Sequence, residues 1–123
     1  MKSIDSAQAG LMLQAAARRI IESKPRLTEL DGKIGDGDHG IGMALGMEKA
    51  EAALAALPED ATVNERFIAV GKAMLTSMGG ASGVIFGTMF RAGAKELPPA
   101  RELDADMPVS YTHLRAHETC ADL

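Results

Sequence analysis

The chain has 123 residues, of which 46% are hydrophobic and 24% charged, so it suits one globular domain and is too apolar to be intrinsically disordered. Its net charge of −4, with no cluster of Lys or Arg, argues against a nucleic-acid-binding surface. The single cysteine, Cys120, excludes an intramolecular disulfide framework, and no apolar run approaches the length of a membrane span. The first residues also lack the apolar core of a signal peptide, so we expect a cytoplasmic protein that does not enter a membrane.

The composition favours closely packed helices over a sheet. With no Trp, one Tyr and three Phe, the core has to be built from aliphatic residues, Ala and the eight Met. The first predicted helix covers residues 5–23, until Pro25 interrupts it. Its apolar stripe consists of Leu13, Ala16, Ala17, Ile20 and Ile21. A short helical turn through Leu27 and Leu30 then leads into a glycine-rich loop.

Three further helices are predicted along the chain. The second spans residues 39–57 and ends before Pro58. The third begins at the capping-box pattern of Thr62 and Glu65 and stops at Gly79. The fourth runs over residues 82–97. No stretch shows the alternation of a half-buried strand, and "GVIFGTMF" is the only β-like candidate. The apolar positions expected to be available for burial are Ile41, Leu45, Ala52, Ala53, Leu54 and Leu57 in the second helix, Phe67, Val70, Met74, Leu75 and Met78 in the third, and Ile85, Phe86, Met89 and Phe90 in the fourth.

The loop "LDGKIGDGDHGIGMALG", residues 30–46, combines three aspartates, one histidine and six glycines. It satisfies G-x-G-x-x-G literally, but no apolar strand precedes it, and aspartates inside a dinucleotide-binding turn would repel a pyrophosphate. It also fails as a calcium EF-hand loop, because Ile41 stands where glycine is needed and Met47 where glutamate is needed. The chain has no Walker A sequence and no serine nucleophile elbow.

The three carboxylates of Asp31, Asp36 and Asp38 favour a metal site. Glycines between them allow the backbone to fold back, and converging carboxylates need a cation between them. Hard oxygen ligands select Mg²⁺ or Ca²⁺, and Mg²⁺ prefers a few carboxylates together with substrate phosphates. We therefore interpret the loop as a magnesium-phosphate site at a helix N-terminus. The alternative is that Asp36 and Asp38 cap the second helix while Asp31 is a solvated turn residue.

A second glycine-rich junction, "SMGGASGVIFG", occupies residues 77–87. Its glycines allow close backbone approach to a ligand, and Ser82 can cap a helix or donate a hydrogen bond. Taken alone, it is also compatible with an ordinary tight turn between two helices. Together, the two junctions are predicted to hold one nucleotide at the same end of a bundle, the first on the phosphates and the second on the base or ribose.

At these two motifs the sequence resembles the L subunit of bacterial dihydroxyacetone kinase, the nucleotide-binding component. The "LD…IGDGDHG…N…G" loop of that family matches Leu30, Asp31, residues 34–40 and Gly46. Its "GG(A/S)SGP(L/I)(Y/F)GTFF" turn matches residues 79–83 and 86–90. The resemblance implies an all-α barrel of antiparallel amphipathic helices, of which this chain would contain about the first four. Gly42, Val84 and Met89 depart from the family pattern.

The resemblance also implies a set of site residues. By position, Asp31, Asp36 and Asp38 resemble the ligands of two Mg²⁺ ions that accompany bound ADP or ATP. The start of the phosphate-binding helix corresponds to His39, Gly40, Ile41 and Gly42, and the second nucleotide contact corresponds to Ala81 and Ser82. No catalytic side chain is implied on this chain, because the histidine that holds dihydroxyacetone belongs to the separate K subunit.

The function that the resemblance implies is that of a nucleotide- and magnesium-binding component of a kinase for dihydroxyacetone or a related short ketose. The "DHG" form resembles the phosphotransferase-system-dependent type, in which a phosphocarrier subunit recharges the bound ADP. The alternative is a non-catalytic L-type module that senses nucleotide or docks to a regulator. The family domain is about twice as long as this chain, so the chain alone is expected to be inactive.

The chain divides into residues 1–107, the expected part of the helical domain, and a tail of residues 108–123. The tail contains two of the three His and the only Tyr. Its "VSYTHLRAHET" stretch resembles a peptide that recurs at the ends of unrelated translated sequences, as read-through of a sequencing adapter would produce. We therefore predict that the tail is non-native, and assign no metal-binding role to His113 and His117 despite their helical spacing.

Deleting residues 108–123 is accordingly expected to leave the thermal melt and the helical circular dichroism unchanged, because a non-native tail packs against nothing specific. Loss of a cooperative melt on deletion would instead show that the tail belongs to the folded structure.

Overall fold

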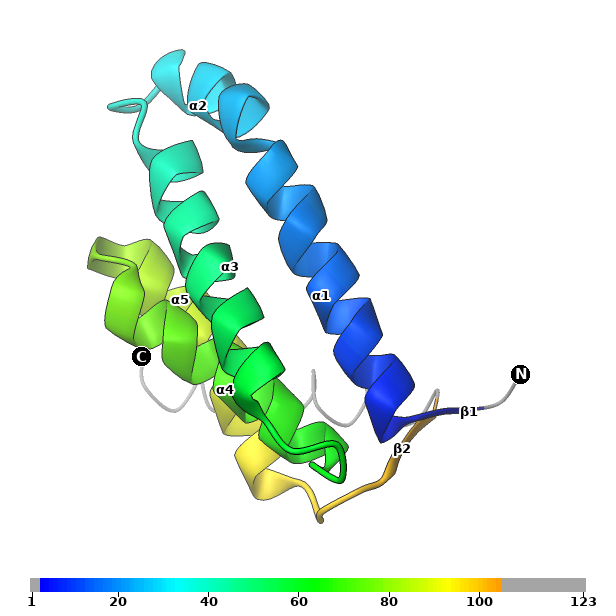
Figure 1. The fold of residues 1–123 in the computed structure, drawn as a ribbon. Helices are drawn as coiled ribbons and strands as arrows, with labels where there is room; N and C mark the ends of the chain where they lie inside the picture. Colours follow the sequence, from blue (N-terminus) through cyan, green and yellow to red (C-terminus); the bar gives the residue numbers. More distant parts are fainter. Residues whose placement is uncertain (1–2, 105–123) are drawn as a thin grey trace.

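The computed structural model describes residues 3–104, which form a bundle of helices closed at one end by two short strands (Figure 1). The predicted tail, residues 108–123, lies outside the described residues. Neighbouring long helices are antiparallel, and the all-α class predicted from the sequence is confirmed. Within residues 3–104, no helix is both long enough and apolar enough to cross a membrane. The elements in chain order are β1 (Ser3–Asp5), α1 (Ser6–Glu22), α2 (Lys24–Gly32), α3 (His39–Ala56), α4 (Val63–Ser77), α5 (Gly80–Glu96) and β2 (Glu102–Asp104).

The helix boundaries follow local capping chemistry. At the start of α1, the Asp5 carboxylate accepts from the Gln8 N–H at 2.7 Å, and the Gln8 side chain accepts from the Asp5 N–H at 2.9 Å, a capping box that the sequence interpretation missed. Half of the capping box predicted for α4 is present: Thr62 Oγ1 accepts from the Glu65 N–H at 3.1 Å, while the Glu65 carboxylate accepts from the Thr62 hydroxyl at 3.2 Å. The short turn predicted before the glycine loop is a separate helix, α2, with Pro25 in its first turn.

The structure contradicts the expectation that no strand is present. Strands β1 and β2 pair antiparallel, with Ile4 opposite Leu103. Each has only three residues, which is too short to display the alternation by which a strand is recognised. Their pairing also depends on α4 and α5 bringing the chain back beside the start of α1. Such a long-range contact cannot be predicted from local sequence.

Methionine and alanine dominate the core. The predicted stripes of α1 and α4 are confirmed at Leu13, Ala17, Val70, Met74 and Met78, which are buried. Ala16 of the predicted α1 stripe is exposed. The core cluster consists of Leu13, Ala17, Met43, Met47, Ala50, Leu54, Val70, Ala73, Met74 and Met78.

Four of the apolar positions predicted to be available for burial are exposed instead. Ile41 and Ile85 are each 54% exposed, Leu45 is 40% exposed, and Ala52 also lies on the surface. In α3 the prediction failed because apolar residues occur on nearly every side of that helix, so periodicity did not select one face. The face that packs carries small and flexible side chains, among them Ala50.

Helices α4 and α5 cross with their backbones in close contact. A Cβ placed on Gly71 would lie 2.6 Å from both the Arg91 nitrogen and the Gly87 oxygen. Since these are backbone atoms, they cannot move aside as the end of a side chain can. The pair is further held by buried Asn64, whose amide nitrogen lies 2.9 Å from the Ala94 oxygen near the end of α5.

Replacing Gly71 with Ala is expected to reduce the free energy of unfolding by about 1–3 kcal/mol, because the added methyl group pushes two helix backbones apart. Urea denaturation measures this change. Gly42→Ala is the matched control, since a Cβ there meets no atom within 4 Å beyond its own helix and alanine favours helix by about 1 kcal/mol. Equal effects of the two substitutions would contradict the close crossing.

Candidate metal and phosphate site

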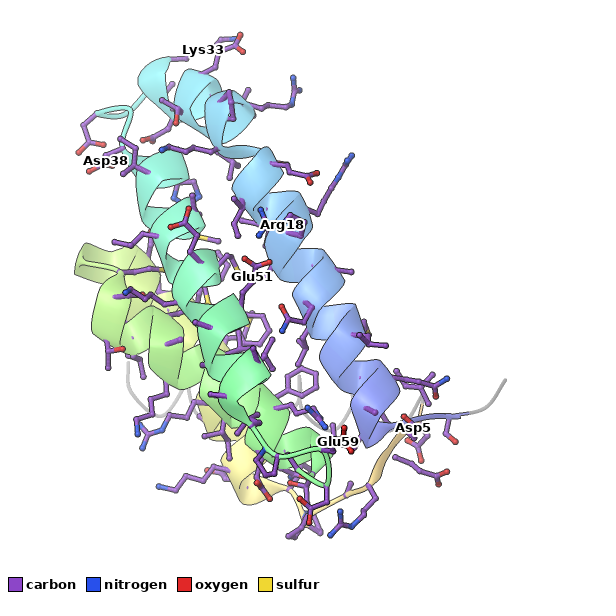
Figure 2. All side chains as sticks on the ribbon, viewed as in Figure 1. Asp5, Arg18, Lys33, Asp38, Glu51 and Glu59 are labelled. Carbon is purple, nitrogen blue, oxygen red and sulfur yellow. The ribbon has the colours of Figure 1, made fainter. Side chains whose placement is uncertain are left out.

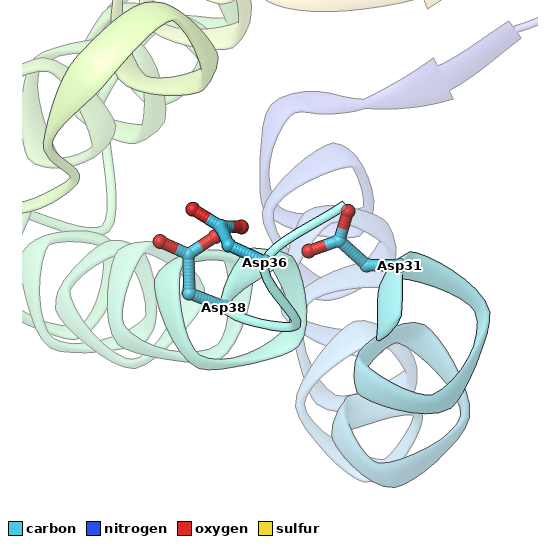
Figure 3. Close-up of side chains that lie close together, drawn as sticks. All are labelled: Asp31, Asp36 and Asp38. Atoms are coloured by element: carbon cyan, nitrogen blue, oxygen red, sulfur yellow. The ribbon is translucent and has the colours of Figure 1, made fainter. Parts of the chain in front are cut away.

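Three carboxylates converge at the junction of α2 and α3. Asp31 lies in the last turn of α2, Asp36 in the following loop, and Asp38 directly before α3. One oxygen from each lies within 4.8 Å of the others. Figure 3 shows the side chains of Asp36 and Asp38 next to each other, with Asp31 across the loop from them. The structure therefore brings together all three aspartates predicted to be metal ligands, with Asp31 half-buried and the other two exposed.

Hydrogen bonds to Asp31 fold the loop back on itself. Its backbone oxygen accepts from the Gly35 N–H at 2.6 Å and from the Ile34 N–H at 3.2 Å. Its side-chain Oδ2 accepts from the His39 N–H at 3.1 Å, which joins the end of α2 to the first residue of α3. Between these contacts, Gly37 takes a φ of +79°, a conformation that side-chain-bearing residues rarely adopt.

The first turn of α3 rests directly on α2. Gly40 is buried, and a Cβ there would lie 2.9 Å from the Thr28 nitrogen and closer still to Thr28 Oγ1 and to the Lys24 oxygen. Only glycine allows this contact without displacing α2. The supporting role of Thr28 was not predicted, because nothing in the sequence indicates which residue of α2 faces Gly40.

The two exposed aspartates share a hydrogen bond, and their pKa values move in opposite directions. The hydrogen bond from Asp38 holds the pKa of Asp36 below its ordinary value. The pKa of Asp38 is raised, first by that hydrogen bond and then by the negative charges of Asp36 and Asp31. Without a cation, a proton thus relieves the repulsion within the cluster. A divalent cation would do so more effectively, and an all-oxygen set fits Mg²⁺ or Ca²⁺.

The side chain of Asp38 does not cap α3, contrary to the alternative interpretation of the loop. Asp38 is the N-cap residue by position, but its side chain accepts no capping hydrogen bond from the helix. The next four residues form the first turn of α3 and are the predicted phosphate contacts. Gly40 is buried, Ile41 is exposed, and His39 and Gly42 are half-buried.

The second predicted contact, Ala81 and Ser82, lies in the first turn of α5, with Ala81 exposed and Ser82 half-buried. The turn before α5 packs on α3, since a Cβ on Gly46 would lie 2.6 Å from Met78 Cγ. Gly46 follows His39 by seven residues, or about 10 Å along the helix. The two junctions are thus at the same end of the bundle but about two helical turns apart (Figure 1).

Comparison with known proteins identifies the class to which this fold and loop belong. Residues 33–119 match the DAK2 domain, a stretch that contains Asp36 and Asp38 and starts two residues after Asp31. The chain therefore belongs to the DAK2 domain family. This confirms the resemblance to the L subunit of dihydroxyacetone kinase that the two motifs indicated.

The individual relatives are kinases or kinase subunits. Over 77 residues the chain is 44% identical to the ADP-binding subunit of a PTS-dependent dihydroxyacetone kinase from Lactococcus lactis, covering 63% of this chain and 40% of the relative. Over 107 residues it is 35% identical to the ADP-binding subunit of PEP-dependent dihydroxyacetone kinase 2 from Listeria innocua, covering 84% of this chain and 48% of the relative. A D-erythrulose kinase from Mycolicibacterium smegmatis is 40% identical over 79 residues, 63% of this chain and 14% of the relative. The chain thus spans less than half the length of each of these three relatives.

Replacing Asp36 with Asn is expected to lower the pKa of Asp38, because the substitution removes a negative charge and supplies an amide that can donate to Asp38. An NMR titration of the carboxyl carbons measures this change. Because the raised pKa makes Asp38 hold its proton to higher pH, cation affinity should increase as pH rises through that pKa, and the increase should move to lower pH in the variant. Asp60→Asn, in another exposed loop, is the control. An unchanged Asp38 pKa in Asp36→Asn would contradict the coupling.

Proposed function

We propose that this chain is the nucleotide- and magnesium-binding component of a kinase that phosphorylates dihydroxyacetone or a related short ketose. The observation that carries the proposal is the convergence of Asp31, Asp36 and Asp38 within 4.8 Å at the start of α3, in a member of the DAK2 domain family. The printed names of the relatives, which describe ADP-binding subunits of dihydroxyacetone kinases, support it.

The three aspartates would hold two Mg²⁺ ions together with the nucleotide phosphates. When bound, these ions supply positive charge that neutralises the phosphates during phosphoryl transfer. The chain's own part is positioning. Asp31 fixes the start of α3 through the His39 N–H, and the N-terminal turn of α3, residues 39–42, directs backbone N–H groups and a partial positive charge toward a phosphate. Ala81 and Ser82 would contact the ribose or base of ADP or ATP.

The remaining chemistry belongs to partners. The substrate would be held on a separate K subunit, and a phosphocarrier subunit would recharge the bound ADP, as the PTS- and PEP-dependent names of the relatives suggest. We assign no catalytic side chain to residues 3–104, whose contribution is binding and orientation. This chain by itself is therefore expected to transfer no phosphate to a ketose.

Calorimetry of ADP binding with and without Mg²⁺ tests the assignment. Binding is expected to require Mg²⁺ and to weaken at least tenfold in Asp36→Ala and in Asp38→Ala, since each removes an oxygen ligand and a negative charge. Asp60→Ala is the matched control for loss of one exposed acidic residue. Metal-independent binding, or binding that neither site substitution weakens, would refute the site.

A reconstitution assay separates the kinase component from a nucleotide sensor. A full-length family member combined with K and phosphocarrier subunits is expected to transfer phosphate to dihydroxyacetone or another short ketose. Nucleotide binding without transfer to any short ketose would favour the sensor or docking module instead.

A further inference from the structure

The side chain of Arg66 is buried at the end of the bundle opposite the aspartate loop. Only 7% of the surface of Arg66 is exposed to solvent. Nε donates to Ser6 Oγ at 2.9 Å, and Nη2 donates to the Glu59 backbone oxygen at 3.1 Å. The Ser6 hydroxyl in turn donates to the Ala61 backbone oxygen. Figure 2 shows Glu59 and Asp38 at opposite ends of the molecule.

No carboxylate among residues 3–104 forms an ion pair with this guanidinium. The ion pair in that part of the chain joins Arg18 and Glu51, and no acidic oxygen in it lies within 4 Å of the guanidinium nitrogens of Arg66. Two of the five N–H groups are used by Ser6 and Glu59. Nη1 makes no hydrogen bond to any residue that the structure describes. A buried cation that lacks a counter-charge is costly, so an anion beside it is favoured.

Arg66 lines a hollow of about 460 Å³ between α1 and the end of α3. One wall is a face of α1 that includes Gly10 and Leu11, and the other includes Leu57 and Pro58. The Arg66 side chain packs over Gly10, since a Cβ there would lie 3.0 Å from Arg66 Nη1, and both residues line the hollow. The volume lies in the range of small-molecule sites, which combine apolar walls with a few polar groups.

We propose that this hollow binds a small aliphatic carboxylate. The Nη1 and Nη2 edge of Arg66 matches the two oxygens of a carboxylate, and the apolar walls at Leu11 and Leu57 match a short hydrocarbon tail. A single guanidinium balances one negative charge, so a monocarboxylate suits the hollow better than a more highly charged anion such as phosphate. The site is independent of the nucleotide and lies at the other end of the bundle.

Binding of hexanoate to the full chain, followed by NMR and calorimetry, tests the proposal. Hexanoate is expected to bind saturably, shift the Arg66 side-chain resonances and raise the melting temperature. Hexanol has a similar tail but no charge, and inorganic phosphate has charge but no tail. Each is expected to bind at least tenfold more weakly than hexanoate.

Two variants locate the site. Arg66→Met should abolish the preference for hexanoate over hexanol, with Arg26→Met, an exposed arginine on α2, as its control. Because loss of Arg66 also removes the bonds to Ser6 and Glu59, Ala7→Phe provides an independent variant. Ala7 is exposed on the lining, so phenylalanine fills the hollow and leaves those bonds in place.

The expected result is at least a tenfold loss of hexanoate binding in Ala7→Phe with an unchanged melt in the absence of ligand. Hexanoate that binds no better than hexanol or phosphate, or that binds equally well to Ala7→Phe, would overturn the proposal. Magnesium-dependent ADP binding should be the same in Ala7→Phe as in the unmodified chain, so failure here is distinguishable from failure of the proposed function.

Discussion

The contact between the first turn of α3 and the backbone of α2 is the constraint on which the aspartate cluster depends. Gly40 fits against Thr28 and the Lys24 oxygen only because it lacks a side chain. With the two helices held at that separation, the His39 N–H reaches Asp31 Oδ2, and the loop between them is short enough to place Asp36 and Asp38 beside Asp31. A site of three like charges is unfavourable by itself, so its geometry has to be imposed by packing elsewhere.

The remainder of the bundle keeps that end of α3 in place. The turn before α5 packs against Gly46, and α5 is pressed onto α4 where Gly71 and Gly87 meet. At the other end, the Asn64 amide donates to the carbonyl groups of Ala94 and Leu97 at the end of α5, and its Oδ1 accepts from the Ala100 N–H at 2.8 Å. Small residues at the crossings and polar ties at the helix ends thus compensate for a core with few aromatic side chains.

The two ends of the bundle offer opposite electrostatics. One end gathers carboxylates, and the hydrogen bond between Asp36 and Asp38 lowers the pKa of the first and raises that of the second. The other end buries the Arg66 guanidinium beside one backbone oxygen and a hydroxyl. A cation stabilises a cluster of carboxylates, and an anion stabilises a buried guanidinium. Charge compensation therefore favours a cation at one end of the bundle and an anion at the other.

The sequence by itself determined the helical class, most helix boundaries, the family and the three aspartates. Those features are encoded locally, in apolar periodicity, in glycine and proline positions, and in a loop whose carboxylates are within eight residues of one another. Tertiary structure alone decided which face of α3 is buried, that β1 pairs with β2, that Thr28 supports Gly40, and that Arg66 is enclosed. Some of these features depend on contacts between residues far apart in the chain. Others depend on which of several helix faces is buried, and apolar periodicity does not distinguish those faces. Both are fixed only when the helices pack.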